Sequence, residues 1–209
     1  EIGVRLVGSE MCIRDSAWGV QIVFDNQVIL GTRARKTRTK SFNAFSSIDY
    51  PETAMFRDRR LIQFLQRPAD YTHAVFSTAL DPNVFVLRLV PGMRADIIPM
   101  LEGRYRALVL ESFGVGGLPG GDDGAMFAAV RDWCGAGHLA VFTTQVPHEG
   151  SDLAVYEVGR AAKALPGVLE AHDMTPEATA VKLMWVLGQT TDRAEAEKLF
   201  LTPVQWDIL

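Results

Sequence analysis

The sequence predicts an α/β fold with a small parallel sheet flanked by helices. From about residue 81 onward, short β-rich apolar runs alternate with helical segments, and this order implies right-handed crossovers and parallel strands. The apolar run Ala107–Leu110 then breaks into a loop that holds five glycines and one proline between Gly114 and Gly121. Ligands in open α/β sheets bind beyond the carboxyl ends of the strands, so this loop is a candidate binding element.

The composition excludes several classes of protein. A length of 209 residues supports one large domain or two small ones with a real core. The formal net charge of -4 gives no electrostatic footprint for nucleic acid. No run of eighteen apolar residues is present, so we expect no membrane partner. Two cysteines, Cys12 and Cys134, give no disulfide framework and predict a reducing cytoplasmic location.

The first sixteen residues are interpreted as an artefact. They have neither the long apolar core nor the small-residue cleavage site of a signal peptide. The stretch Arg5–Ser16 resembles the in-frame translation of a transposon-type sequencing-library adapter. We therefore expect the native reading frame to begin near Ala17.

Residues 17–80 begin with a predicted hairpin, in which Val20–Phe24 and Val28–Leu30 flank the turn residues Asp25–Gln27. The basic run 31–40 is interpreted as a solvated face or loop. Residues 46–80 have mixed polarity and predict an irregular connection with one strand. A domain boundary is predicted near Asp81, which divides the chain into residues 17–80 and 81–209.

Residues 81–209 carry the alternating pattern. The run Val84–Val90 predicts a strand that Pro91 and Gly92 end. Asp122 or Asp123 is predicted to cap the helix after the glycine loop, and Thr175 the helix that begins at Pro176. The other predicted strands are 106–110, 138–144 and 168–169, and the predicted helical segments are 95–102, 124–133, 155–164, the segment from 176, and 192–201.

One stripe on the helix that begins at Pro176 is predicted to face the core. Val181, Met184, Trp185 and Gly188 recur at helical spacing. A stripe of methionine and tryptophan at this spacing is typical of packing against a sheet rather than of a cofactor site.

Two other readings of the motifs are disfavoured. Gly114, Gly116 and Gly120 follow a strand and precede a helix, but their spacing is one residue longer than a dinucleotide fingerprint. His148, Glu149 and Asp152 match no metal-ligand spacing on a helix or strand, so we predict a solvated loop there and no metal site.

Several segments, taken in order, resemble the cytoplasmic, type I branch of the bacterial L-asparaginases. The resemblance runs from about Val20 to the carboxyl terminus, and its order and spacing are more specific than any single piece. The matching pieces are Phe24-Asp-Asn26, Gly31-x-Arg33-x-x-Lys36, Ser41-Phe-Asn-Ala-Phe45, Ser112-Phe-Gly-Val-Gly-Gly-Leu-Pro119, Thr143-Thr-Gln145, Gly150-Ser-Asp152, Asp173-Met-Thr-x-Glu-Ala178 and Lys182-Leu-Met-Trp185.

This resemblance implies hydrolysis of L-asparagine to L-aspartate and ammonia through an acyl-enzyme on a threonine, with no cofactor. A second threonine is activated in the family by an aspartate–lysine pair, and Lys36 matches that catalytic lysine. The family's threonines lie in an amino-terminal portion that matches nothing here. Residues 17–80 are therefore expected to be the remnant of the N-terminal catalytic domain with its linker, and residues 81–209 a complete C-terminal asparaginase domain. We expect this fragment to be inactive by itself.

The resemblance also implies substrate-binding residues and a homodimer or homotetramer of the full-length protein. The segment at Gly116 and Gly117 matches a loop that helps to bind the substrate's amino-acid head in the neighbouring subunit. Some members carry asparagine at the position of Gly117, so a side-chain contact there is not expected in this chain. Glu157 is assigned to the acidic group that meets the substrate ammonium. Glu111 stands where an allosteric member has arginine, so that effector site is not expected.

Two alternatives stay open at the level of sequence. One is an ammonia-generating amidotransferase subunit of the same superfamily, which works on a tRNA-linked reaction with a partner protein. The other is a non-catalytic amino-acid-binding α/β domain that uses the glycine loop.

Overall fold

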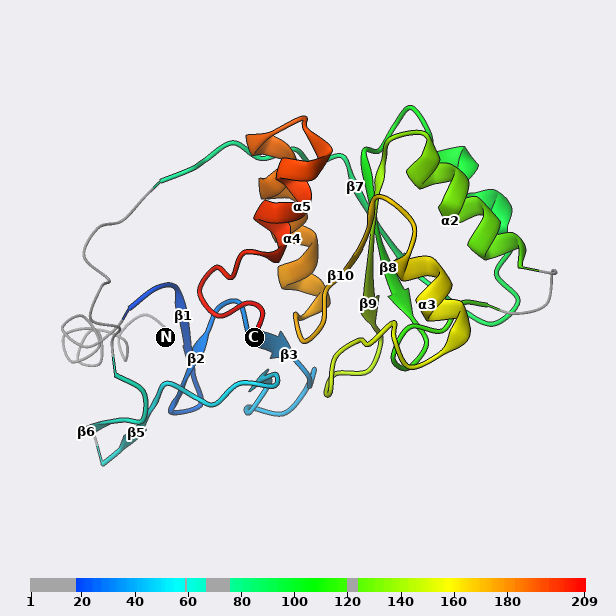
Figure 1. Cartoon of the computed structure of the whole chain (residues 1–209). Helices are drawn as coiled ribbons and strands as arrows, with labels where there is room; N and C mark the ends of the chain where they lie inside the picture. The colour runs from blue at the N-terminus through cyan, green and yellow to red at the C-terminus, as the bar shows by residue number, and fades with distance from the viewer. Residues whose placement is uncertain (1–17, 59, 67–75, 120–123) are drawn as a thin grey trace. The chain divides into compact units, whose positions relative to one another are not determined.

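The computed structural model describes residues 18–58, 60–66, 76–119 and 124–209 (Figure 1). The chain divides into two compact units, Glu1–Ser77 and Thr78–Leu209. Each unit is described separately below.

The predicted hairpin of the N-terminal unit is confirmed. β1 (Gln21–Phe24) pairs antiparallel with β2 (Gln27–Leu30), and Asp25 and Asn26 in the turn have φ values of 49° and 62°. Positive φ at both turn positions is the geometry of a type I′ turn, which matches the twist of the two strands. The hairpin therefore forms for the local reason that the sequence suggests.

The expectation of a single strand in residues 46–80 is wrong. β5 (Ala54–Arg57) and β6 (Arg60–Gln63) form a second hairpin that extends the sheet in the order β1-β2-β5-β6. β5 is held by pairing with β2, and the amide of Thr53 donates to the carbonyl of Val28 at 2.8 Å. The partner of β5 is distant in sequence, so the local pattern does not show that β5 joins this sheet.

The basic run is only partly a solvated face. Its strand β3 (Ala34–Lys36) pairs with β4 (Phe45–Ser47), and the side chains from Lys36 to Lys40 are exposed. Arg33 is fully buried, and its guanidinium carbon lies 5.4 Å from the centre of the Tyr50 ring. The aromatic face offers a cation–π contact to this buried charge.

The C-terminal unit confirms the predicted parallel sheet. β7 (Val84–Arg88), β8 (Ala107–Ser112), β9 (Leu139–Thr144) and β10 (Val168–Glu170) are all parallel, in the order β10-β9-β8-β7. Helices α4 (Pro176–Gln189) and α5 (Arg193–Leu201) cover one face, and α2 (Ala125–Gly135) and α3 (Glu157–Lys163) cover the other (Figure 1). The sheet is thus the middle layer of an α/β sandwich.

The predicted N-terminal cap of α4 is confirmed, and one predicted helix differs from the structure. The Oγ1 of Thr175 accepts the amide of Ala178 at the start of α4, as predicted. The predicted cap residues of α2, Asp122 and Asp123, lie outside the described residues, and Gly124 with φ 82° occupies the N-cap position. The helix predicted over 95–102 is two short 3-10 turns, Ala95–Ile97 and Pro99–Leu101, because proline cannot continue the hydrogen bonding of one helix.

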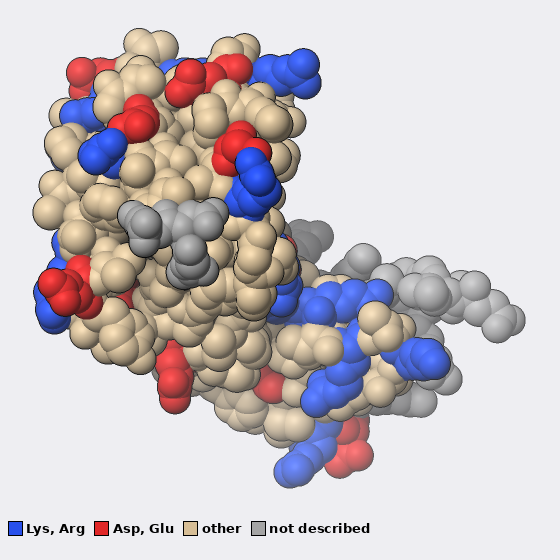
Figure 2. All heavy atoms as spheres, turned by 90° about the vertical axis from the view of Figure 1, so that its right-hand side faces the viewer, with Lys and Arg blue, Asp and Glu red and all other residues tan. Residues whose placement is uncertain are grey.

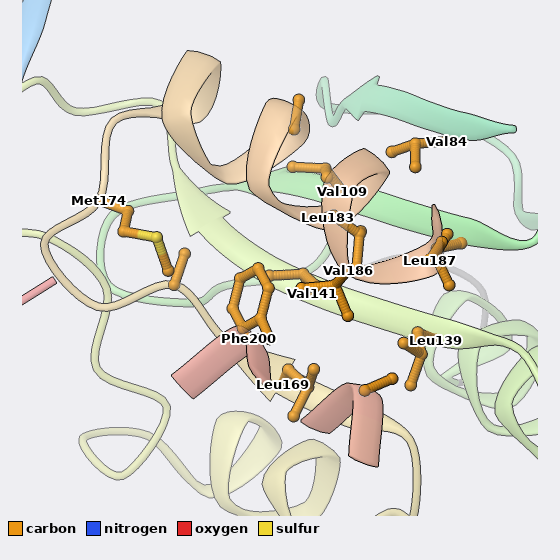
Figure 3. Close-up of a cluster of buried hydrophobic side chains, with 14 of the residues drawn as sticks. Val84, Val109, Leu139, Val141, Leu169, Met174, Leu183, Val186, Leu187 and Phe200 are labelled. Carbon is orange, nitrogen blue, oxygen red and sulfur yellow. The ribbon is translucent and has the colours of Figure 1, made fainter. Parts of the chain in front are cut away.

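Two apolar clusters hold the three layers together. Between the sheet and α4 and α5, Val109 and Val141 pack against Leu183, Val186 and Phe200 (Figure 3). On the opposite face a second cluster joins the sheet to α2 and α3. Its fully buried members include Leu108, Leu110, Val130, Trp133, Phe142 and Leu153.

The Met/Trp stripe of α4 faces the core only in part. Met184 and Trp185 pack against the cluster between the sheet and α4 and α5, as predicted, whereas Val181 does not. Val181 is 59% exposed, whereas Leu183, Val186 and Leu187 point into the core. At Met184 and Gly188 the stripe also contacts the segment that leads into β7. The amide of Asp81 donates to the carbonyl of Met184 at 2.9 Å, and a Cβ on Gly188 would lie 2.4 Å from the carbonyl oxygen of Ala79.

Candidate functional site

The candidate site lies at the carboxyl ends of the parallel strands, where hydrogen bonds fix the strand ends. The Oγ of Ser112 donates to the carbonyl of Thr143 at 2.7 Å, which joins β8 to β9. The side-chain amide of Gln145 donates to the carbonyls of Leu89 and Glu111 at 2.6 and 2.9 Å. Three strands therefore end in a fixed register, which gives the loops beyond them a rigid base.

The glycine loop closes into a tight turn after β8. The amides of Gly116 and Gly117 both donate to the carbonyl of Phe113, at 3.1 and 2.7 Å, and the amide of Phe113 donates to the carbonyl of Gly117 at 3.0 Å. Gly114 has φ 50° and Gly116 φ 151°, conformations that glycine tolerates without a Cβ clash. Because these two amides are used inside the turn, Gly116 and Gly117 form a shaped wall rather than a pair of ligand donors.

Two neighbouring segments anchor this turn from outside. The Oγ1 of Thr144 donates to the carbonyl of Gly114, and the amide of Asp152 donates to the carbonyl of Val115 at 2.8 Å. Gly150 itself has no room for a side chain, since a Cβ there would lie 2.5 Å from the carbonyl oxygen of His172. One residue of the Thr-Thr-Gln motif and one of the Gly-Ser-Asp motif thus each hold a backbone carbonyl of the glycine turn.

Gly116 and Gly117 differ in the space around them. A Cβ on Gly116 would lie 2.5 Å from Cδ2 of Leu153, a side chain that is 1% exposed. A Cβ on Gly117 would meet the carbonyl oxygen and Cβ of Phe113 at 3.3 and 3.4 Å. The turn therefore requires glycine at 116 and leaves tight but usable room at 117.

Glu157 is the first residue of α3 and its side chain is exposed. Its neighbours on this surface are apolar and exposed, with Val155 at 50%, Tyr156 at 60% and Val158 at 51%. Further along the helix, a Cβ on Gly159 would lie 2.4 Å from the carbonyl oxygen of Leu153. The beginning of α3 and the turn at Gly116 are therefore both built against Leu153, which brings two of the predicted binding elements to the same buried residue.

Glu170, the last residue of β10, is not among the site residues predicted from the sequence. Its side chain is 4% exposed, its Oε1 accepts the amide of Leu153 at 2.7 Å, and its Oε2 lies 3.0 Å from Nζ of Lys163. The available signal is a carboxylate directly after the apolar pair Val168 and Leu169. This signal is not enough to identify Glu170 as a site residue, because its partners Leu153 and Lys163 are recognised only in the tertiary structure.

Lys36 belongs to the N-terminal unit, where it ends β3 opposite Phe45 and its side chain is exposed. Strand alternation sends the Arg35 side chain to the other face of the ribbon. Arg38 donates from Nη1 to the carbonyl of Asn43 at 3.0 Å. Arg38 and Arg33 thus each have a partner other than Lys36, the Asn43 carbonyl and the Tyr50 ring.

A hollow of about 660 Å³ opens in the same unit, beside the turn at Asp25 and strand β4. Its lining includes Glu52, whose Oε1 accepts the side-chain amide of Gln27 at 2.5 Å, and burial raises the pKa of the Glu52 carboxyl above its ordinary value. Lys36 is not among the described residues that line this hollow.

The charged groups of the C-terminal unit make no concentrated patch in the view of Figure 2, where basic and acidic side chains are interspersed. His148, Glu149 and Asp152 are exposed loop residues. Over the described ranges, no three His, Cys, Asp or Glu side chains are grouped closely enough to hold a metal ion. None of the described helices is long and apolar enough to cross a membrane.

Two family profiles match the chain. Residues 83–200, more than half of it, match the Glutaminase/Asparaginase C-terminal domain, and residues 7–69 match Asparaginase, N-terminal. The second match begins inside residues 1–16, the segment that the sequence alone suggests to be an artefact.

The curated relatives include an L-asparaginase and glutamyl-tRNA(Gln) amidotransferase subunits. The chain is 38% identical over 182 residues to an L-asparaginase of Thermococcus kodakarensis, an alignment that covers 87% of this chain and 54% of the relative. It is 31% identical over 214 residues to a glutamyl-tRNA(Gln) amidotransferase subunit of Metallosphaera sedula, with 96% of this chain and 47% of the relative covered. The chain thus spans about half the length of these relatives.

Solved structures show the same fold. The thermostable L-asparaginase from Thermococcus kodakarensis superposes with a TM-score of 0.89 at 33% identity, over 97% of this chain and 61% of that one. L-asparaginase I from Vibrio cholerae superposes with a TM-score of 0.75 at 23% identity, over 91% of this chain and 57% of that one. The second similarity concerns the fold alone.

Proposed function

Because the chain belongs to the glutaminase/asparaginase family, we propose that the protein hydrolyses the side-chain amide of L-asparagine to L-aspartate and ammonia. The observation that carries this proposal is the glycine turn Phe113–Gly117, which is fixed at the carboxyl ends of β8 and β9 in a chain that is 38% identical to an L-asparaginase over 182 residues. A site of this kind suits a small amino acid.

The proposed chemistry is acyl transfer through an ester. A threonine hydroxyl adds to the amide carbon, the carbon–nitrogen bond breaks, and ammonia leaves with the hydroxyl proton. Water then cleaves the ester, which releases aspartate and restores the threonine. The 209 residues contain neither a Thr-Gly-Gly-Thr nor a Gly-Thr-Asp-Thr segment. We therefore expect this chain alone to release no ammonia.

Lys36 is proposed as the catalytic residue that this chain contributes. A lysine amine can accept a proton when its neutral form is favoured by its surroundings. Lys36 is exposed at the end of β3. Its proposed role is to help activate the second threonine of the family through an aspartate.

Gly116, Gly117 and Glu157 are proposed to bind the amino-acid head of the substrate. The Gly116–Gly117 backbone would supply a wall without side chains, and the Glu157 carboxylate is proposed to pair with the substrate ammonium. Leu153 lies against both the Gly116 turn and the start of α3, which supports a shared role for these elements.

The full-length protein is proposed to act as a homodimer or homotetramer in the cytoplasm, without nucleic acid. Exposed Val155, Tyr156 and Val158 beside Glu157 support a subunit contact at this surface, because apolar patches next to a polar residue mark interaction sites. Cys134 is a buried free thiol, which suits a reducing compartment. Within the family, the order of the motifs from Ser112 to Trp185 supports assignment to the cytoplasmic type I branch.

The second candidate function is that of an ammonia-generating amidotransferase subunit. The observation in its favour is the 31% identity to the glutamyl-tRNA(Gln) amidotransferase subunit of Metallosphaera sedula, over 96% of the chain. Such a protein requires a partner to use its ammonia. Ammonia release from free asparagine without any partner distinguishes asparaginase from this candidate.

The test measures ammonia release from asparagine by the protein made from the complete coding sequence and, in parallel, by the 209-residue chain. We expect turnover by the first and none by the second. An aspartyl-enzyme trapped by acid quench and detected by mass spectrometry would exclude a non-catalytic amino-acid-binding domain. Turnover by the 209-residue chain contradicts the placement of the nucleophile, and no turnover by either protein overturns the proposal.

Lys36→Met and Lys40→Met form a matched pair for the catalytic assignment. Both side chains are exposed in the same basic run. Loss of a proton acceptor is expected to lower kcat by about 10²–10⁴-fold in Lys36→Met. Lys40→Met should keep the activity of the unaltered protein, and equal losses in both variants would reject Lys36 as the catalytic group.

A further inference from the structure

We infer that Glu170 is a positioning residue that sets the geometry of the substrate-binding elements through the backbone of Leu153. This inference rests on the proposed function, because it takes Gly116, Gly117 and Glu157 as the residues that meet the substrate. Glu170 itself is not proposed to touch the substrate.

Glu170 is a buried carboxylate whose two oxygens have different partners. Oε1 accepts the amide of Leu153 at 2.7 Å, and Oε2 lies 3.0 Å from Nζ of Lys163 at the end of α3. Nδ1 of His172 lies 3.8 Å from Oε2. A buried charge is retained only when hydrogen bonds and opposite charges compensate for its lost hydration, so this carboxylate holds its partners firmly.

Leu153 connects Glu170 to the glycine turn, because Glu170 holds its amide and its side chain packs against Gly116. Its side chain is 1% exposed, and its Cδ2 occupies the space where a Cβ on Gly116 would lie. The adjacent amide, that of Asp152, donates to the carbonyl of Val115 at 2.8 Å. A shift of the Leu153 backbone would therefore move the packing surface and a hydrogen bond of the turn together.

Leu153 also connects Glu170 to α3, through its backbone carbonyl. Its carbonyl oxygen lies so close to Gly159 that a Cβ there would approach to 2.4 Å. The next carbonyl, that of Ala154, accepts Nη1 of Arg160 at 3.1 Å. The first turn of α3, which begins with Glu157, is therefore seated directly on the segment that Glu170 holds.

The two oxygens of Glu170 allow the hydrogen bond to be separated from the ion pair. Glu170→Gln keeps an acceptor for the Leu153 amide and loses the charge opposite Lys163. Glu170→Met keeps the approximate volume and loses both. Lys163→Met loses the ion pair alone and leaves the Leu153 hydrogen bond in place.

The test uses the protein from the complete coding sequence and measures kcat and KM for asparagine per titrated active site. We expect Glu170→Met to raise KM about tenfold, because the binding elements lose the position that Glu170 sets, with a smaller change in kcat. Glu170→Gln and Lys163→Met should stay within about twofold of the unaltered KM. If Glu170 had a purely structural role, Glu170→Met would lower the thermal stability and the fraction of active protein. The KM of the remaining active protein would then not rise more than its kcat falls.

Hydrogen exchange at the Leu153, Gly116 and Gly117 amides provides a readout that does not need turnover. We expect faster exchange in Glu170→Met and unchanged exchange in Lys163→Met. An unchanged KM or unchanged exchange in Glu170→Met overturns the positioning role, and so does an equal effect of Lys163→Met. If the unaltered protein fails to hydrolyse asparagine, the proposed function is rejected, while the exchange data still decide whether Glu170 controls these segments.

Discussion

The Leu153 side chain occupies the position that a side chain on Gly116 would need: a Cβ on Gly116 would lie 2.5 Å from Cδ2 of Leu153. Leu153 is buried against the second apolar cluster, so it cannot swing into solvent without losing that packing. The backbone of Gly116, at φ 151°, is also one that residues with a side chain rarely adopt. The need for glycine at this position is therefore both steric and conformational.

Gly116→Ala is expected to destabilise the protein by about 1–3 kcal/mol, because both backbone strain and overpacking act at this site. Urea unfolding measures this change. Gly117→Ala is the matched control, since its Cβ would make contacts of 3.3 and 3.4 Å only. Equal losses in the two variants would show that the contact with Leu153 does not set the requirement.

Gly117→Asn tests the role of the glycine turn in substrate binding. The position has room for a Cβ, and some members of the family carry asparagine there. One added hydrogen bond to the substrate is worth about 1 kcal/mol, so KM for asparagine should fall about fivefold while the urea midpoint changes little. An unchanged KM with intact stability would argue that residue 117 does not face the substrate.

The buried ion pair between Lys182 and Asp207 is expected to secure the carboxyl-terminal segment on α4. Lys182 Nζ lies 2.8 Å from Asp207 Oδ2 and donates to the carbonyl of Thr202 at 2.8 Å. Burial lowers the pKa of the Lys182 amine, and the hydrogen bond and charge of Asp207 oppose that shift. Asp207→Ala leaves this cation buried without its counter-ion and should cost about 3–5 kcal/mol in urea unfolding.

The comparison for this prediction is Glu197→Ala, which removes the partner of Arg193 in a half-exposed pair at 3.7 Å. Exposed pairs contribute under about 1 kcal/mol. If Asp207→Ala lowers the free energy of unfolding no more than Glu197→Ala does, the buried pair contributes no more to stability than the exposed one.

The Asp81 carboxylate, just before β7, is expected to make the stability of the protein fall at acidic pH. Its carboxylate accepts the amide of Asn83 at 2.9 Å and pairs with Arg106 at 2.7 Å. Burial acts to raise the Asp81 pKa, but these hydrogen bonds and the Arg106 charge outweigh it and hold the pKa below its ordinary value. A lowered folded pKa stabilises the protein above the unfolded pKa of about 4, and this contribution is lost as pH falls through the folded value.

Urea midpoints of the unaltered protein and Asp81→Asn, followed from neutral to acidic pH, measure this effect. The unaltered protein should be more stable near neutral pH, and the difference should shrink below about pH 4. Asp96→Asn, in a half-exposed pair with Arg94, serves as the control with little pH-dependent difference. A difference for Asp81→Asn that stays constant with pH would contradict the assignment.

Cys134 is expected to resist alkylation in the folded protein. Burial raises the pKa of its thiol to about 11, although the charge of Arg193 opposes the shift. The thiolate that reacts is therefore scarce at about pH 8, and the side chain is 2% exposed. Iodoacetamide followed by peptide mass mapping should leave Cys134 unmodified until guanidinium unfolds the chain. Modification at equal rates in folded and unfolded protein would refute the protection.

The elements that could be predicted from the sequence are those whose causes are local. The turn at Asp25 and Asn26, the cap at Thr175 and the apolar runs of the parallel strands each depend on residues that are close in sequence, and each was predicted. The order of the motifs also led to the asparaginase family. Its profiles match residues 7–69 and 83–200. These features are readable because propensity, capping and periodicity act over a few residues.

Other features depend on residues that are far apart in sequence, and they became known from the folded structure. β5 forms on β2, Val181 is exposed although it belongs to the predicted core stripe of α4, and Arg33 is buried although it opens a basic run. Glu170 gains its meaning from Leu153 and Lys163, which lie on other segments. In each case the energy comes from a contact between residues far apart in sequence, and no local pattern contains that information.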